Sequence, residues 1–129
     1  MVTSLPLVGL ATGGEFEAHT IVLGVNDAPV VVFLEHRRIR TDLPEFYANL
    51  NKFLRFGFID RGNAFKALRN YGNLWQVSAT SHRMLGFRWG NVLVLTNGFE
   101  KKRQDTEQKH IDCCEERKAA FQRDQGGAP

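Results

Sequence analysis

Between residues 66 and 103 the chain carries cationic side chains that could act on a phosphate group. They are Lys66, Arg69, Arg83, Arg88, Lys101, Lys102 and Arg103. Lysine and arginine bind RNA phosphates and can stabilise the charge of a pentacoordinate phosphorane. Such a phosphorane forms when a ribose 2′-OH attacks its own phosphodiester, so RNA itself supplies the nucleophile. These residue types therefore predict RNA binding, with strand cleavage by 2′-OH attack as the chemistry.

Other catalytic signatures are missing from the sequence. No Gly-rich phosphate loop follows a predicted strand, and neither His-Glu-x-x-His nor Gly-x-Ser-x-Gly occurs. The four histidines are far apart and lack the spacing of metal ligands. We select His82 as a candidate proton carrier because it adjoins Arg83 on the predicted phosphate-binding sheet. We expect no metal and no small-molecule cofactor.

Charge is distributed unevenly along the chain. The formal net charge is only +3, yet residues 36–103 contain thirteen Lys and Arg against four Asp and Glu. The rest of the chain contains four basic and ten acidic residues. A basic body with acidic flanks suits a partner that bears phosphates, although a solvated charged surface explains the same counts equally well.

Cysteine use and hydropathy point to a soluble, cytoplasmic protein. Cys113 and Cys114 are adjacent, so they build neither a disulfide framework nor a spaced zinc motif. The apolar run from Leu5 to Ala11 has no Lys or Arg before it and makes a poor signal peptide. No run reaches the ~20 apolar residues of a membrane span. We therefore expect no membrane association.

The stretch from Leu74 to Thr106 contains the elements that must position the cations. Its first two thirds are predicted to form three short strands, with Gly90-Asn91 as the hairpin turn between the second and the third. The third strand, residues 92–95, leads through Gly98-Phe99 into Lys101-Lys102-Arg103. The pattern predicts an antiparallel meander with basic residues at its end.

Alternation along the middle strand separates two sets of side chains. One face should carry Arg83, Leu85, Phe87 and Trp89, and the other His82, Met84, Gly86 and Arg88. In the tail, Lys101 and Arg103 point to the same side if the backbone stays extended.

Helices are predicted before the meander. Residues 41–56 form the clearest one, because Asp42 and Glu45 give an Asp-x-x-Glu start and an apolar stripe continues over three turns. Residues 30–38 fit a strand by propensity, but Asp27 as N-cap would equally open a helix. Periodicity leaves both alternatives open.

A last helix is predicted after the meander. Asp105 or Thr106 can cap it. Its apolar stripe is thin and consists of Ile111, Cys114 and Phe121, so we expect it to pack loosely or to need a partner.

The remaining segments complete one domain. Residues 16–25 are predicted as a first strand, and residues 58–72 as a loop or short helical passage. We divide the chain into a flexible N-terminal extension (1–14), a folded domain (15–124) and a frayed tail (125–129).

Four short motifs follow one another in a defined order. They are Lys66-Ala67-Leu68, Leu74-Trp75-Gln76-Val77, His82-Arg83-Met84-Leu85, and Gly98-Phe99 continuing to Thr106. Their order and spacing resemble the RelE/HigB toxin superfamily, in its phage-derived HigB-like branch. The pattern of that branch is Lys-x-Leu, Leu-Trp-Glu-Leu-Arg, Tyr-Arg-Val and Gly-Phe-x-Lys-Lys-Thr-x-Lys-Thr-Pro. The similarity extends over residues 16–123.

The resemblance implies a fold, an activity and partners. The implied fold is α+β, a small antiparallel sheet packed by two N-terminal helices plus a C-terminal helix, and it assigns residues 30–38 to a helix. The implied activity is that of a toxin of a toxin–antitoxin system, an endoribonuclease that cuts mRNA, often on the ribosome. The implied partners are mRNA, the ribosome and a helix-turn-helix antitoxin.

The resemblance also implies roles for single residues. Arg83 and Lys101 would stabilise the phosphate charge, with His82 as the proton carrier. The residues that would bind and position RNA are Lys66, Arg69, Lys102, Arg103 and Gln104.

The chain departs from the family pattern at several of these positions. Ser78 stands where the family has an arginine, and Asp105 and Glu107 replace a lysine and a proline. Either His82 and Arg103 compensate, or the protein is a weak or inactive member that binds RNA or an antitoxin. A phage accessory protein that acts only through protein contacts is the third alternative.

Overall fold

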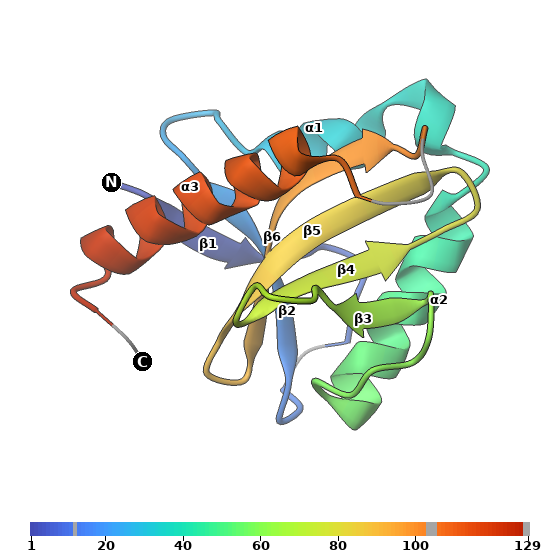
Figure 1. Ribbon diagram of the computed structural model, residues 1–129, viewed down its shortest axis with the longest axis horizontal. Coiled ribbons are helices and arrows are strands. Elements are labelled where there is room, and N and C mark those ends of the chain that lie inside the picture. The colour runs from blue at the N-terminus through green and yellow to red at the C-terminus, as the bar shows by residue number, and fades with distance from the viewer. Residues whose placement is uncertain (12, 103–105, 128–129) are drawn as a thin grey trace.

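The computed structural model describes residues 1–11, 13–102 and 106–127 and folds them around one sheet. Its strands are β1 (Thr3–Pro6), β2 (Glu17–Val22), β3 (Phe65–Ala67), β4 (Leu74–Ser78), β5 (His82–Trp89) and β6 (Val92–Glu100). Its helices are α1 (Pro29–Glu35), the 3-10 helix η1 (Arg37–Ile39), α2 (Leu43–Phe56) and α3 (Gln108–Asp124). Figure 1 shows α3 across one face of the sheet, with α1 and α2 on the other.

The sheet is mixed and has the strand order β1-β2-β6-β5-β4-β3. Neighbouring strands are antiparallel except β2 and β6, which run parallel. The predicted α+β class is confirmed, but the prediction of a small, purely antiparallel sheet is wrong. Parallel neighbours are joined by a long crossover, and no local sequence pattern reveals which distant strand will be the partner.

The N-terminal segment contributes a strand that the sequence did not predict. Residues 3–6, assigned to the extension, form β1 and pair with β2. The backbone N–H of Val2 donates to Asp124 Oδ2 at 2.7 Å, and Gln125 Nε2 donates to the Val2 carbonyl at 3.0 Å. The end of α3 therefore holds the start of the chain. Within the predicted tail, residues 128–129 lie outside the described part of the chain.

Two further element boundaries differ from the prediction. Residues 65–67 form the edge strand β3 inside the segment predicted as a loop or short helix. Three residues are too few to show a period-two pattern, and their partner strand defines them instead. The N-cap of α3 is Glu107, so Thr106 does not cap this helix. Asp105 lies outside the described residues.

The locally encoded elements agree with their predictions. α2 matches the predicted helix, and α1 with η1 resolves the helix-or-strand alternative in favour of a helix. The meander is formed by β4, β5 and β6, and the turn between the last two contains Gly90 at φ 62°. Alternation along β5 is also confirmed, because Met84 packs toward α1 and α2 while Leu85 and Phe87 pack toward α3.

The sheet separates two apolar clusters. The cluster on the α1/α2 side is rich in aromatic rings and includes Phe46, Leu50, Phe53, Phe65, Val77 and Met84. The cluster on the α3 side includes Ile21, Leu74, Leu85, Phe87, Val94, Ile111, Cys114 and Phe121. The three stripe residues of α3 are buried, and each buried large apolar side chain contributes about 1.5–3 kcal/mol of transfer free energy.

Gly98 shows how closely α1 approaches the sheet. A Cβ atom at this position would collide with the ring of Phe33. The glycine of the Gly-Phe motif is thus explained by packing, because only the bare backbone of β6 leaves room for the ring.

Candidate nucleic-acid interface

On the α3 side, four side chains form a row across β3, β4 and β5, which we call the polar row: Lys66, Gln76, Ser78 and Arg83. In the antiparallel ladders Lys66 lies opposite Gln76, and Ser78 opposite Arg83. Opposite residues share a face, and residues two apart on one strand do so as well. The strand pairing therefore brings Lys66 and Arg83, remote in sequence, onto the same surface.

The middle of the polar row is a buried, hydrogen-bonded floor. Gln76 and Ser78 are only 4% and 5% exposed. Thr106 Oγ1 donates to Gln76 Oε1 at 2.5 Å, and Gln76 Nε2 donates to Ser78 Oγ at 3.5 Å. Gln76 and Ser78 are thus neutral groups with hydrogen-bond partners. The half-buried cations Lys66 and Arg83 lie on either side of them.

Arg83 is fixed by the turn between β4 and β5. Its Nη1 donates to the carbonyl oxygens of Ala79 and His82, the latter at 2.8 Å. Within the described residues, its Nε and Nη2 donate no hydrogen bond to the protein, and these N–H groups form one edge of the guanidinium fork. Burial lowers the pKa of Arg83, and the carboxylates of Glu45 and Asp42 oppose this shift. The guanidinium stays charged at neutral pH and suits a phosphate oxygen pair.

A hollow beside the polar row brings together two of the predicted RNA-binding residues. It has a volume of about 490 Å³ and is lined by Lys66, Ala67, Leu68, Arg69, Tyr71, Thr106 and Ile111. The hydroxyl of Tyr71 donates to Gln108 Oε1 at 3.1 Å, which joins the β3–β4 connection to the start of α3. Two cations over a partly apolar lining suit a phosphate with its attached nucleoside.

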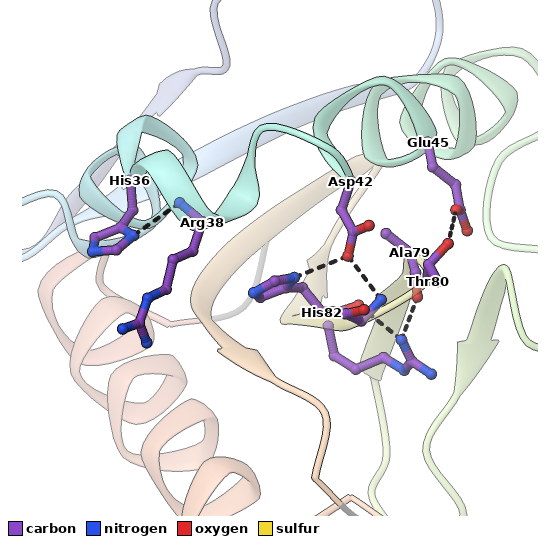
Figure 2. Close-up of polar contacts among 9 residues, drawn as sticks. His36, Arg38, Asp42, Glu45, Ala79, Thr80 and His82 are labelled. Atoms are coloured by element: carbon purple, nitrogen blue, oxygen red, sulfur yellow. Dashed lines mark hydrogen bonds and ion pairs between the residues drawn. The ribbon is translucent and has the colours of Figure 1, made fainter.

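His82 does not occupy this surface, and its predicted role as proton carrier is not supported by its position. It faces the α1/α2 side, is 8% exposed, and its Nδ1 lies 2.9 Å from Asp42 Oδ2. Asp42 also accepts the Ser81 N–H at 2.7 Å, and its own side chain makes no capping bond to α2. Figure 2 shows these contacts, together with the bond of Thr80 Oγ1 to Glu45 at 2.9 Å.

This second group of polar contacts, which we call the turn clamp, consists of Asp42, Glu45, Thr80, Ser81 and His82. Burial raises the pKa of the Asp42 carboxyl, but hydrogen bonds from His82 and Ser81 outweigh burial and leave the pKa below its ordinary value. The predicted Asp-x-x-Glu start of α2 therefore holds the β4–β5 turn instead of capping its own helix. The clamp is structural, and it orients the turn that fixes Arg83.

The basic tail begins on the same side as Arg83. The backbone N–H of Lys101 donates to the Ser81 carbonyl at 2.8 Å. This bond extends the β5–β6 ladder by one residue pair past His82 and Glu100. Alternation then places Lys101 with Phe99 and Arg83. Lys101 and Lys102 are exposed and make no ion pair within the described residues. The predicted site residues Arg103 and Gln104 lie outside the described part of the chain.

Two further residues lie on opposite faces of the sheet, Arg88 on the face that alternation predicts for it. Arg88 lies over the ring of Phe58 at 4.5 Å, which puts it on the α1/α2 side, away from the polar row. His110 was set aside by the sequence, yet its ring stacks on Phe99 with centroids 3.8 Å apart. No sequence signal marks this contact, because it depends on how α3 crosses the sheet.

Comparison with known proteins assigns neither a family nor a function to the chain. No protein-family model matches the chain, and no curated protein matches it. In residues 1–11, 13–102 and 106–127, no three His, Cys, Asp or Glu side chains gather as a metal-ion site would require. No helix in the same ranges is both long and apolar enough to cross a membrane.

Proposed function

We propose that the protein is an mRNA endoribonuclease, the toxin of a toxin–antitoxin pair, which acts in the cytoplasm on ribosome-associated RNA. The observation that carries the proposal is the arrangement of Lys66 and Arg83 on one sheet face, around a buried polar floor and beside the hollow that holds Arg69. Part of the element order is in keeping with the proposal: β2, the helices α1 and α2, the meander β4–β6 and the C-terminal helix α3 follow one another as the RelE/HigB resemblance implies, whereas β1 and β3 are additional strands.

In this proposal Arg83 binds the reacting phosphate. Its anchored Nη1 leaves the Nε edge of the guanidinium for two parallel hydrogen bonds to phosphate oxygens. Lys101 adds positive charge from the end of β6, while Lys66, Arg69 and Lys102 hold the flanking backbone. The 2′-OH then attacks phosphorus, and the cations stabilise the growing negative charge on the equatorial oxygens.

The polar floor also favours a second candidate function, RNA binding without cleavage. Gln76 and Ser78 are uncharged at the positions where the resembled pattern has a glutamate and an arginine. Gln76 is hydrogen-bonded to both Ser78 and Thr106. A site with fewer ionisable groups retains electrostatic affinity but loses proton transfer. Salt-sensitive RNA binding with intact RNA would distinguish this candidate from the leading one.

Inducible expression in bacterial cells tests the proposal. We expect the wild type to stop growth and to create new 5′ ends within mRNA. The double variant Arg83→Ala/Lys101→Ala should restore growth and remove the new ends, at wild-type protein level. Unchanged growth with intact mRNA on wild-type induction, or equal toxicity of the double variant, would contradict the nuclease. Co-expression with a neighbouring helix-turn-helix gene should suppress the toxicity.

A further inference from the structure

His110 occupies a fixed position next to the polar row. It lies in the first turn of α3, and its ring is parallel to that of Phe99, with an interplanar angle of 5°. Phe99 is the β6 residue opposite Arg83. Opposite residues of an antiparallel pair have Cβ atoms about 4.5–5.5 Å apart. His110 therefore stacks on the residue that lies directly opposite the proposed phosphate-binding arginine.

The backbone around His110 is anchored by buried polar groups. The His110 N–H donates to the Glu107 carbonyl at 3.0 Å, and its own carbonyl accepts Asn97 Nδ2 at 3.2 Å. Asn97 is in turn held by Thr96, whose hydroxyl donates to Asn97 Oδ1 at 2.6 Å. These bonds fix the first turn of α3 to β6, so the ring is positioned before any RNA arrives.

The surroundings of His110 favour its neutral form. Burial lowers its pKa, Lys109 adds to this effect, and Glu107 opposes it. The positive end of the α3 dipole also disfavours an imidazolium. On the sheet, the cationic residues that flank Phe99 are Arg83, which lies opposite it on β5, and Lys101, two residues after it in the chain. A neutral imidazole at physiological pH can accept a proton.

The other histidines are not available to the polar row. His82 is bonded to Asp42 on the opposite side of the sheet. His19 lies on β2, with its Nδ1 2.8 Å from Ser4 Oγ. His36 is exposed near η1, where its Nδ1 accepts the Arg38 N–H at 3.2 Å (Figure 2).

We propose that His110 is a catalytic residue that accepts the proton of the attacking ribose 2′-OH, an inference that rests on the endoribonuclease function. As the proton moves to the imidazole, the O2′–P bond forms and the P–O5′ bond breaks. The departing 5′ oxygen takes a proton from solvent water. The products are a 2′,3′-cyclic phosphate and a 5′-hydroxyl, and His110 returns to its neutral form by releasing its proton to solvent.

Single-turnover cleavage of a short RNA by the purified full chain tests this role. His110→Phe preserves an aromatic ring on Phe99 but removes both ring nitrogens. We expect cleavage to fall about 10²-fold or more, with RNA affinity and thermal midpoint close to those of the wild type. The wild-type rate should rise with pH through the pKa of His110, below its ordinary 6.5, and then level off. His110→Phe should lack this rise, and the control His36→Ala should keep it.

Each outcome decides the proposal. Wild-type cleavage and pH profile in His110→Phe would overturn the role of His110 and leave the endoribonuclease standing. Loss of RNA affinity or of folded structure in His110→Phe, in parallel with lost cleavage, would assign His110 a structural role instead. Absence of RNA cleavage by the wild type would remove both proposals together.

Discussion

The two faces of the sheet differ in how they use polar side chains. On the α1/α2 side, Asp42 and His82 are buried and bonded to each other, beneath helices and among aromatic rings. On the α3 side, Lys66 and Arg83 stay half-exposed at one end of a face that α3 covers only in part. Both faces bury an apolar cluster, but only the α3 side also leaves basic side chains of the polar row partly exposed.

This difference shows why neighbours in sequence can have unrelated roles. His82 and Arg83 are adjacent, yet strand alternation sends one into the core and the other to the polar row. The turn clamp links the two faces, because the turn that His82 and Ser81 fix to Asp42 also supplies the carbonyl groups that hold Arg83. Changes on the α1/α2 side should therefore affect stability first and RNA chemistry only through the turn.

The largest expected effect is a core truncation on the α1/α2 side. Phe53 is fully buried, with its ring centroid 4.8 Å from that of Phe58 and 5.4 Å from that of Phe65. Phe53→Ala should lower the free energy of unfolding by about 3–5 kcal/mol, measured by urea titration. The matched truncation of the half-buried Phe99 on the other face should cost clearly less. Equal losses would contradict the difference in burial between these two positions.

A smaller effect is expected from the turn clamp, together with a defined pH dependence. Asp42→Ala leaves the Ser81 N–H and His82 without their acceptor and should cost about 1–3 kcal/mol of unfolding free energy at neutral pH. The folded-state pKa of Asp42 is below its ordinary value of 3.8, so its stabilisation is present above that pH. It is lost as the pH falls through the folded-state pKa.

Unfolding titrations of both proteins across acid pH check this sign. The difference in stability between wild type and Asp42→Ala should be constant near neutral pH and should shrink in acid. A difference that grows as the pH falls would contradict the assigned hydrogen bonds.

The smallest expected effect concerns one cation of the polar row. Lys66→Gln should leave stability unchanged and weaken RNA binding in proportion to one lost phosphate contact. The slope of log affinity against log salt for single-stranded RNA should then decrease by about 0.7, measured by fluorescence anisotropy. Lys52→Gln, an exposed change on α2, is the control and should keep the wild-type slope. Identical slopes in both variants would remove Lys66 from the interface.

The elements that local residue patterns encode were predictable from the sequence. The apolar stripe of α2 and the alternation along β5 repeat with the period of their element, so the helix and the two faces were predictable. The pairing of β2 with β6 and the short strand β3 depend on partners far along the chain, so they were not. Asp42 illustrates the limit, since its local context predicts a helix cap while its observed partners lie about 40 residues away.

The placement of the candidate residues was predictable to a similar extent, while their role stays a prediction. Lys66, Arg69 and Arg83 were selected by residue type and order; the sheet places Lys66 and Arg83 on one face, and Arg69 lines the same hollow as Lys66. His82 was selected because it adjoins Arg83, and that reason failed because adjacent strand residues point to opposite faces. His110 was missed because its stacking on Phe99 arises only when α3 packs on the sheet.

The most direct test compares two arginines of one strand that face opposite sides, Arg83 and Arg88. RNA affinity and cleavage of purified Arg83→Ala and Arg88→Ala should be measured side by side with those of the wild type. We expect Arg83→Ala to lose about 10²-fold or more in cleavage rate and to bind RNA more weakly, with Arg88→Ala close to wild type. Equal losses in the two variants, or wild-type behaviour of Arg83→Ala, would contradict the assignment of RNA chemistry to the α3 side of the sheet.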